Sequence, residues 1–444
     1  MKKALLASAL TAISLVVTGC NIKSLNKKDK YTIMVYMCGA DLESGFDGYS
    51  THASNAGLGS KDIFEMCSAS DKPKDVNIII ETGGAKAWKN SKIDKNKLQR
   101  WHIEDGALVK DQDLQRESMG QSSTFQSFLE WGLKKYPAEK TGVILWNHGG
   151  AMQGVCYDEN YNDDSLLVSE VSEALAGAFK NTGRKEKLEW IGYDACLMQV
   201  QDIAEANSDY FNYMVGSQES EAGEGWDYDR WLDNLYRGET TEQILTEICD
   251  TFVEFYDNHY GKSSNDQTLS FLDLSKMSEY KTAWDNLSTK ISSTIGSSKK
   301  KGFQNMMKTT KNYGTTYYSY YDLINAGLST SPSSQNYYGN YGLVQEGSDY
   351  VDYGYNSFGI FDVKDFLNKL GSSYEGFTSE ISSVQAAYEK LVVYSKIGKV
   401  AGESNGLCLY FPMHDRCHSS DYYSAKETRL TSWKAVTETL GVNK

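Results

Sequence analysis

Short apolar stretches alternate with amphipathic ones through the first half of this chain, and this alternation is what most constrains its fold. Residues 31–38, 76–81 and 143–147 are apolar runs of strand length, bounded by Gly or polar residues. Residues 124–135 instead repeat their apolar side chains at helical spacing. Strands that alternate with helices predict a largely parallel sheet with helices on both faces, an α/β/α sandwich.

Two apolar runs end in residues capable of nucleophilic chemistry. VILWNHGG, residues 143–150, presents His148, and WIGYDACLM, residues 190–198, presents Cys196. Because the carboxyl ends of parallel strands meet at one edge of a sheet, we expect the imidazole and the thiol to be neighbours, as a cysteine nucleophile and its base must be. Either residue alone also has a structural interpretation, since cysteine is among the most buried residue types. Asp41 is a candidate to orient the imidazole, with a loop cap as the alternative.

Groups next to these two residues indicate how a substrate would be held. Gly149 has no side chain, so its N–H can approach a reacting carbonyl and form an oxyanion hole with the N–H of Cys196. Asp194 lies two residues before Cys196 and therefore on the same side of the strand, where a substrate Arg or Lys would neutralise it. The alternative is that Asp194 caps the helix expected at 200–207.

GSQESEAGEGWDY, residues 216–228, is expected to form the other wall of the substrate site. Ser217 would offer backbone pairing to an extended substrate, and Trp226 would form one side of the pocket. Trp226 has an equally good interpretation as a core residue. The helix at 200–207 would also place Cys196 near a helix N-terminus, which lowers the pKa of a thiol.

The same segments carry a resemblance to a known family. Six blocks resemble the clostripain family of cysteine peptidases and span most of the chain: YTIMVYMCGADLE, SMGQSSTFQSFLEW, VILWNHGG, WIGYDACLM, GSQESEAGEGWDY and GLCLYFP. The resemblance implies a caspase-like α/β fold and a catalytic dyad of His148 and Cys196. It also implies cleavage after Arg or Lys, with Asp194 helping to select the basic residue.

The function that this resemblance implies is a cysteine endopeptidase that forms an acyl-enzyme through Cys196. A thiol amidase of different specificity and a non-catalytic surface-binding lipoprotein are the alternatives. Members of the family commonly cut themselves after a basic residue in the loop that follows the His. Residues 149–179 of this chain contain no Lys or Arg, so we expect an active single chain or a self-cut confined to the basic turn at 180–187.

The N-terminus has the pattern of a targeting segment. Residues 1–19 begin with Met and two Lys, continue with an apolar stretch and end in small residues before Cys20. This arrangement resembles a bacterial lipoprotein signal peptide, which implies removal of residues 1–19 and acylation of Cys20 with fatty acids such as palmitate. Residues 20–30 would form a polar tether. We therefore expect an exported protein that is anchored to the bacterial membrane by its lipid and faces outside the cytoplasm.

Charge and side-chain inventory limit the partners and cofactors. The chain carries 59 acidic and 45 basic residues, a formal net charge of −14, which disfavours nucleic acid and suits cationic substrates. Thiol chemistry requires no cofactor. Calcium is a lesser expectation, because Asp158 and Asp164 bound a run of alternating Asp and Asn residues. That run lacks the Gly and Glu of an EF-hand loop, so a solvated loop is the alternative.

The strand and helix patterns of the sequence weaken after residue 230, and this change suggests the domain organisation. A caspase-like catalytic core is expected at 31–230, and a C-terminal region at 231–444 is expected to pack on it and complete it. The Tyr-rich stretch at 312–357 is expected to be a surface insertion, with substrate binding as the alternative. The apolar run at 407–411 is expected to rejoin the main sheet. The other expected elements are strands at 98–104 and 268–274 and helices at 167–179, 241–257, 276–291, 361–370 and 379–394.

Overall fold

The computed structural model describes residues 28–45, 56–69, 75–316, 343–346, 349–352, 355–356, 358–414, 417–424 and 430–442. The predicted signal peptide, Cys20, most of the tether and most of the Tyr-rich stretch lie outside these residues. Among the described residues, no helix combines the length and the apolar character that crossing a membrane requires.

The N-terminal half contributes the strands β1 (Asp29–Cys38), β2 (Val76–Gly83), β3 (Lys97–Glu104), β4 (Ala107–Gln115), β5 (Ala138–Trp146), β6 (Val155–Asp158), β7 (Asp164–Leu166), β8 (Leu188–Asp194) and β9 (Phe211–Gly216). The C-terminal half contributes β10 (Thr268–Asp273), β11 (Thr315–Thr316), β12 (Leu343–Glu346), β13 (Asp349–Asp352), β14 (Tyr355–Asn356), β15 (Ile360–Asp362), β16 (Val392–Ile397) and β17 (Cys408–Tyr410). The helices are α1 (Ala40–Ser44), α2 (Leu58–Ser68), α3 (Ser122–Lys135), α4 (Val168–Thr182), α5 (Gln201–Asn207), α6 (Tyr228–Arg237), α7 (Thr241–Tyr256), α8 (Met277–Thr294), α9 (Lys300–Lys308), α11 (Val363–Ser373), α12 (Thr378–Leu391), α13 (Ser420–Ser424) and α14 (Thr431–Leu440).

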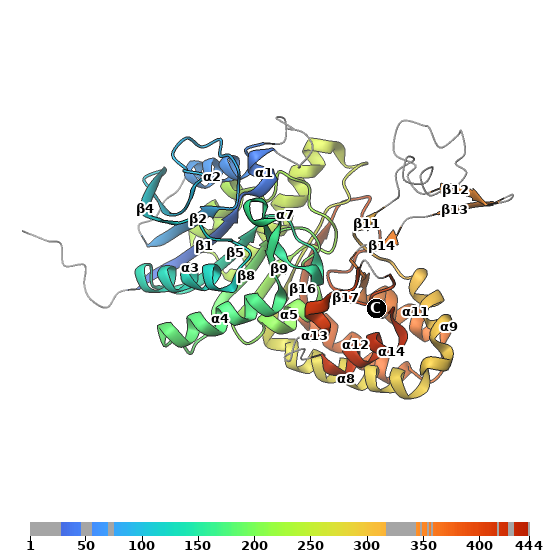
Figure 1. Ribbon diagram of the computed structural model, residues 1–444. Coiled ribbons are helices and arrows are strands. Elements are labelled where there is room, and N and C mark those ends of the chain that lie inside the picture. Colours follow the sequence, from blue (N-terminus) through green and yellow to red (C-terminus); the bar gives the residue numbers. More distant parts are fainter. Residues whose placement is uncertain are drawn as a thin grey trace, which may run out of the picture.

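A nine-stranded sheet in the order β16-β10-β9-β8-β5-β1-β2-β3-β4 forms the centre of the molecule (Figure 1). The five strands from β9 to β2 are parallel. Antiparallel pairing extends the sheet by β3 and β4 at one edge and by β10 and β16 at the other. This mostly parallel sheet confirms the predicted α/β class and brings the carboxyl ends of β1, β5 and β8 to one edge.

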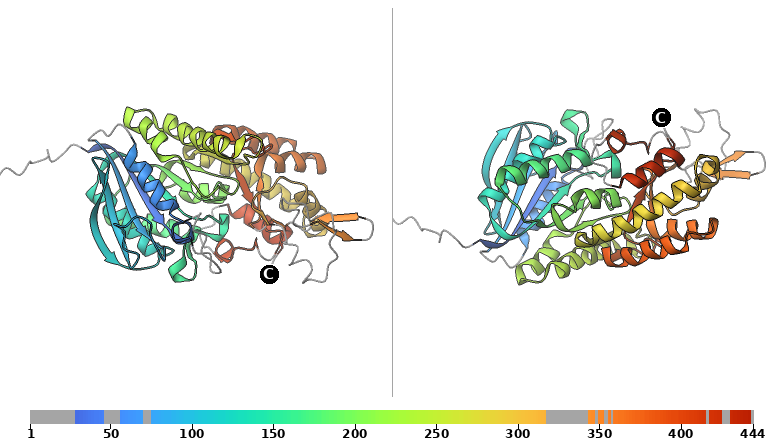
Figure 2. Two further views of the ribbon diagram at one scale, coloured as in Figure 1. Left: turned by 90° about the horizontal axis from the view of Figure 1, so that it is seen from above. Right: turned by 90° about the horizontal axis from the view of Figure 1, so that it is seen from below.

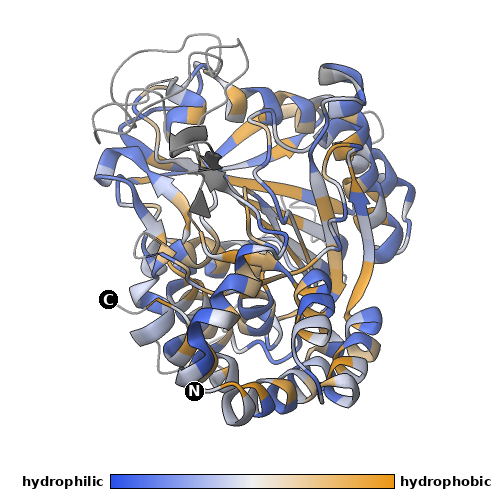
Figure 3. Ribbon diagram, turned by 90° about the vertical axis from the view of Figure 1, so that its right-hand side faces the viewer, coloured by the Kyte–Doolittle hydropathy of each residue, from blue (hydrophilic) through white to orange (hydrophobic). Residues whose placement is uncertain are grey.

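Helices cover both faces of the sheet (Figure 2). Alternate residues of β1 enter different cores: Tyr36 packs with residues of α3 and α4, and Val35 packs with residues of α2, α6 and α7. A strand that is covered on both sides must be apolar throughout, and Figure 3 shows apolar residues along the central strands. The continuous apolar runs of the sequence therefore have a direct structural cause.

The C-terminal half differs from the prediction in its strands. The helix expected at 379–394 ends at Leu391, and the chain continues as β16, which pairs with β10 at the sheet edge. Val392, Val393 and Tyr394 have β-branched or aromatic side chains, which favour a strand. The run at 407–411 does form a strand, β17, but it pairs with β15 in a separate two-stranded sheet, so the prediction that it rejoins the main sheet is wrong.

The C-terminal helices share a core with the sheet. Aromatic rings from three of them meet, with the centroids of Trp284 and Trp433 separated by 5.2 Å and those of Phe366 and Trp433 by 5.5 Å. These rings belong to the same apolar cluster as Tyr36 of β1. The C-terminal half is therefore packed against the sheet as well as supplying two of its strands.

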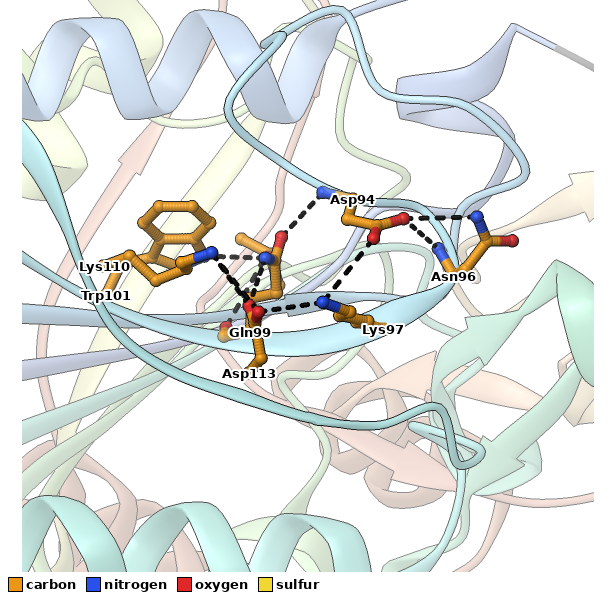
Figure 4. Close-up of polar contacts among 8 residues, drawn as sticks. Asp94, Asn96, Lys97, Gln99, Trp101, Lys110 and Asp113 are labelled. Atoms are coloured by element: carbon orange, nitrogen blue, oxygen red, sulfur yellow. Dashed lines mark hydrogen bonds and ion pairs between the residues drawn. The ribbon is translucent and has the colours of Figure 1, made fainter.

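Charged residues line the outer edge of the sheet at β3 and β4 (Figure 4). Asp113 of β4 accepts hydrogen bonds from Lys97 at 2.8 Å and from Gln99 at 2.7 Å, and Lys110 Nζ lies 3.1 Å from its carboxylate. An edge strand with a network of charges is a poor template for pairing with another chain. This edge lies away from the dyad strands and protects the sheet.

Candidate active site

His148 and Cys196 follow neighbouring strands at the carboxyl edge of the sheet. β5 ends at Trp146 and β8 at Asp194, and these two residues are paired in register, so each candidate side chain lies two residues past its strand. The loops touch at Gly149, where a Cβ would lie only 2.1 Å from the carbonyl oxygen of Cys196. Gly149 is therefore required for the loop of His148 to approach that of Cys196.

Burial of the Cys196 thiol disfavours its ionisation. Burial and the nearby Glu221 carboxylate raise the pKa of Cys196 to about 11, despite opposing hydrogen bonds from the backbone N–H groups of Glu221, Gly149 and Cys196 itself. The Glu221 N–H lies 3.2 Å from the sulfur. The predicted lowering of the pKa by a helix N-terminus is wrong, because Cys196 occupies a turn and α5 begins only at Gln201.

Asp41 lies against the imidazole of His148. Its Oδ1 atom is 2.8 Å from His148 Nε2, and α1, which follows β1 directly, supplies it. Partial burial opposes ionisation of Asp41, but the hydrogen bond and charge of His148 outweigh it and lower the pKa of this carboxyl. With Nε2 engaged by Asp41, Nδ1 is the nitrogen of His148 that can exchange a proton with a thiol or a substrate.

Asn147 fixes the backbone of the histidine loop. Its side-chain amide donates to the carbonyl of Cys38 at 2.7 Å and accepts from the N–H of Tyr157 at 2.8 Å. These bonds join the ends of β1, β5 and β6. The loop that carries His148 is therefore tied to the strands on both sides.

A cavity of about 220 Å³ opens beside the two residues. His148 and Cys196 line it together with Asp194, Glu221 and Gly225. Gly225 has a φ of +67°, and a Cβ there would lie 3.1 Å from Asp194 Oδ1 and 3.3 Å from Asp62 Oδ2. A residue with a side chain would thus be strained and would crowd the carboxylates at the end of the cavity.

Two buried carboxyl groups, those of Asp194 and Glu221, line this cavity, and that of Asp62 lies beside it across Gly225. Burial raises the pKa of Asp194 to about 7 and raises the pKa values of Glu221 and Asp62 well above their usual range, with repulsion from Asp194 adding to both. Tyr228 donates to Asp194 at 2.8 Å, and the Glu221 carboxyl group lies against the Asp194 carboxyl and the Trp226 indole. None of the three acids forms an ion pair within the described part of the chain. A cation entering the cavity would supply the missing partner.

Two residues expected on the pocket wall lie elsewhere. Ser217 is fully buried: its hydroxyl contacts that of Thr268 at 2.9 Å, and its carbonyl accepts the N–H of Gln199 at 2.9 Å. Ser217 therefore presents no exposed backbone group to a substrate. Trp226 packs against Gly192 in the core, and only its backbone N–H reaches toward Asp194. The wall is formed instead by the intervening residues 221–225.

The acidic residues proposed for calcium are engaged by the protein. Asp158 accepts the N–H groups of Met119 at 3.0 Å and Asn160 at 2.9 Å, and Asp164 accepts the hydroxyl of Ser118 at 2.6 Å. These contacts hold the β6–β7 hairpin against the start of α3. Among the described residues, the acids close enough together to share a cation are Glu65, Asp227 and Asp229, which belong to α2 and the start of α6.

The sequence pointed to Asp194 but not to its acidic neighbours. Glu221 was visible only as one acid among small residues in the segment 216–228. No pattern in the sequence indicated Asp62, because α2 is distant in sequence from the other site residues. The Asp62 carboxylate accepts a hydrogen bond from Trp146 Nε1, at 2.7 Å, only in the folded chain.

A thiol, an imidazole and an acidic cavity at the carboxyl edge of an α/β/α sandwich define the class of thiol-dependent hydrolases. The family model described as the clostripain family matches residues 36–435, so this chain belongs to the clostripain family and is a cysteine peptidase. Clostripain of Hathewaya histolytica is 25% identical over 478 residues, covering 92% of this chain and 80% of the relative.

Solved structures share the fold. An inactive zymogen C11 protease from Parabacteroides distasonis has a TM-score of 0.58 at 16% identity, covering 93% of this chain and 99% of that one. A secreted C11 cysteine protease from Bacteroides thetaiotaomicron, in complex with an irreversible peptide inhibitor, has a TM-score of 0.58 at 15% identity, covering 91% and 99%. Both confirm the architecture expected from the sequence.

Proposed function

We propose that this protein is an endopeptidase that cuts peptide bonds after Arg or Lys, with Cys196 as nucleophile and His148 as general base and acid. The observation that carries the proposal is the 220 Å³ cavity, which these two residues line together with the buried acids Asp194 and Glu221. Its dimensions suit one long side chain. A guanidinium or ammonium group in it would pair with carboxylates that otherwise have no cation.

Substrate binding positions the scissile carbonyl over the sulfur. Cys196 transfers its proton to Nδ1 of His148, and the sulfur attacks the carbonyl carbon. Asp41 holds the imidazole through Nε2 and stabilises the imidazolium that forms. The N–H groups of Gly149 and Cys196, which already approach the sulfur, are placed to receive the developing oxyanion.

His148 then completes both halves of the reaction. Its Nδ1 proton passes to the leaving amine as the C–N bond breaks, which leaves the acyl group on Cys196. A water molecule gives a proton to the same nitrogen, attacks the thioester and releases the acid. The thiolate recovers the proton and the enzyme returns to its starting state.

The test compares peptide coumarin amides with Arg, Lys or citrulline before the bond, because citrulline keeps the shape of Arg without its charge. We expect kcat/KM to fall at least about thirtyfold from Arg to citrulline, since a buried charge loses its partner. In Asp194→Asn the difference between Arg and citrulline should shrink.

Asp105→Asn is the matched control for that variant, because it removes the same charge from the exposed β3–β4 turn at the opposite end of the strands. Equal hydrolysis of the Arg and citrulline substrates by the wild type would reject the basic specificity. It would favour an amidase of broader specificity.

Location forms a second part of the proposal. The basic start, apolar stretch and Cys20 support export, removal of residues 1–19 and lipid anchoring of the protein outside the cytoplasm. Expression in a bacterial host with labelled palmitate should label the wild type but not Cys20→Ala, and only the wild type should enter the detergent phase on partitioning. Labelling of both proteins would reject Cys20 as the anchor.

A further inference from the structure

A second cavity meets the first at the candidate dyad. It has a volume of about 770 Å³ and shares His148 and Cys196 with the acidic cavity, but its remaining walls are different. The walls come from the ends of β1 and β2, the glycines after His148 and the hairpin of β6 and β7. A volume of this size is within the range of ligand pockets and exceeds the needs of one side chain.

The positions of the two cavities assign their roles in peptide cleavage. The acidic cavity receives the side chain before the scissile bond, which places the carbonyl at Cys196. The chain after that bond must leave past His148, because the imidazole protonates its amine. The larger cavity lies on this side, against Asp41 and Gly150. We call it the leaving-side cavity.

The β6–β7 hairpin supplies an acidic wall to the leaving-side cavity. Glu159 has a side chain only 6% exposed and lies 3.5 Å from Lys86 Nζ, so this pair is neutral. Asp163 is exposed at the hairpin tip and forms no ion pair within the described part of the chain. Asp41, the third acid, is engaged by His148 Nε2 at 2.8 Å. The surplus charge in the cavity is therefore negative and centred on Asp163.

The hairpin holds Asp163 in a defined position. Asp163 has a φ of +57°, which residues with side chains rarely adopt, and its N–H donates to the carbonyl of Asp158 at 3.1 Å. Asp158 is itself fixed by the N–H groups of Met119 and Asn160. The contacts of Asp158 thus help to present Asp163 at the cavity.

We infer that the leaving-side cavity binds the first two residues after the scissile bond and favours a basic side chain there. This inference rests on the proposed function, and together they make bonds between two basic residues the preferred sites of cleavage. Lys86 acts against the preference, because it neutralises Glu159 and repels an incoming cation.

The test uses internally quenched peptides with Arg before the bond and either Lys or uncharged norleucine at the first or second position after it. We expect Lys to raise kcat/KM about threefold to fivefold at one of the two positions, the range of a partly exposed ion pair. The Lys-to-norleucine ratio should fall toward one in Asp163→Asn and rise above the wild-type ratio in Lys86→Gln.

Asp105→Asn is the matched control, since it removes an exposed acid that also has a positive φ, +48°, but lies outside the cavity. Its ratio should equal that of the wild type. In the wild type, the ratio should also decline as NaCl rises from about 0.05 M to about 0.5 M, because salt screens an exposed pair.

An Arg coumarin amide, which has no residue after the bond, separates this inference from the proposed function. If the wild type cleaves the amide but shows a ratio of one with the peptides, the inference is overturned and the proposed function stands. If the amide is not cleaved, the proposed function fails and the inference fails with it. Ratios unchanged by Asp163→Asn and Lys86→Gln would overturn the assignment of this cavity.

Discussion

Filling the acidic cavity with a small cation should activate the thiol of Cys196. Burial and the Glu221 carboxylate raise the pKa of Cys196 to about 11. At pH 7.5 a thiol with that pKa is ionised in only about one molecule in three thousand. Methylguanidinium is small enough to pair with Glu221 and Asp194 at the end of the cavity while leaving the sulfur open to a reagent.

Electrostatics sets the size of the effect. A unit charge at roughly 5 Å from the sulfur, in an environment with an effective dielectric constant of about 20, contributes about 3 kcal/mol. One pKa unit corresponds to about 1.4 kcal/mol, and part of the charge is spent on neutralising the acids. We therefore expect bound methylguanidinium to accelerate alkylation of Cys196 about tenfold to a hundredfold near neutral pH.

The assay measures the rate at which iodoacetamide modifies Cys196, followed by mass spectrometry of the peptide that contains it. Iodoacetamide is uncharged, so the cation acts on the thiol rather than on the reagent, and methylurea is the neutral control. Glu221→Gln should react faster than the wild type without the cation and respond less to it. The reasoning is refuted if methylguanidinium inhibits cleavage of Arg substrates competitively but leaves the alkylation rate unchanged or lower.

Three further predictions concern other residues. Asp41→Asn should lower kcat at least about tenfold with little change in KM, and should shift the pH profile of kcat, because the imidazolium loses its negative partner. Asp202 is buried, neither of its carboxylate oxygens has a hydrogen-bond partner among the described residues, and burial raises its pKa to about 8, so the folded state keeps a proton that the unfolded chain releases at lower pH. Stability should therefore fall as pH rises from about 4 to about 8, and the fall in the thermal unfolding temperature should be smaller in Asp202→Asn. Purified wild-type protein should stay a single chain, and any cut in the turn at 183–187 should be absent from Cys196→Ala and should accelerate with protein concentration. That turn precedes β8 at the end opposite Cys196, roughly 20 Å away along seven strand residues, so one molecule cannot reach its own turn. N-terminal sequencing after incubation checks this prediction.

The sequence predicted the structure correctly where the position of a residue depends on a single buried strand. β1, β2, β5 and β8 are buried on both faces, so each appears as a continuous apolar run, and the residues after β5 and β8 must lie at one edge. β4 was missed because an edge strand with charged side chains has no such run. β16 was missed because a helix precedes it without a break.

The acidic cavity combines residues from separate segments of the chain, so no single segment predicts it. Asp194 was identifiable because it is the last residue of β8 and precedes Cys196 by only two positions. Asp62 reaches the same place from α2, and Glu221 from the loop after β9, and neither position follows from local periodicity. Ser217 was misplaced for the same reason, since its carbonyl and hydroxyl are engaged by Gln199 and Thr268. For Trp226, the structure agrees with the interpretation as a core residue, because its ring packs against Gly192.

Under the proposed function, the position of Glu221 would couple selection of the substrate to activation of the nucleophile. Its carboxylate lines the cavity beside Asp194, while its N–H lies 3.2 Å from the sulfur of Cys196. A basic side chain that pairs with this carboxyl group therefore brings a positive charge close to the thiol, and that charge favours the thiolate. An uncharged side chain of equal shape brings no positive charge to the site. A substrate with such a side chain would therefore gain neither the binding energy of the ion pair nor the activation of the Cys196 sulfur. On this geometry the preference for basic residues should appear in kcat as well as in KM, because the cation is part of what makes the sulfur reactive.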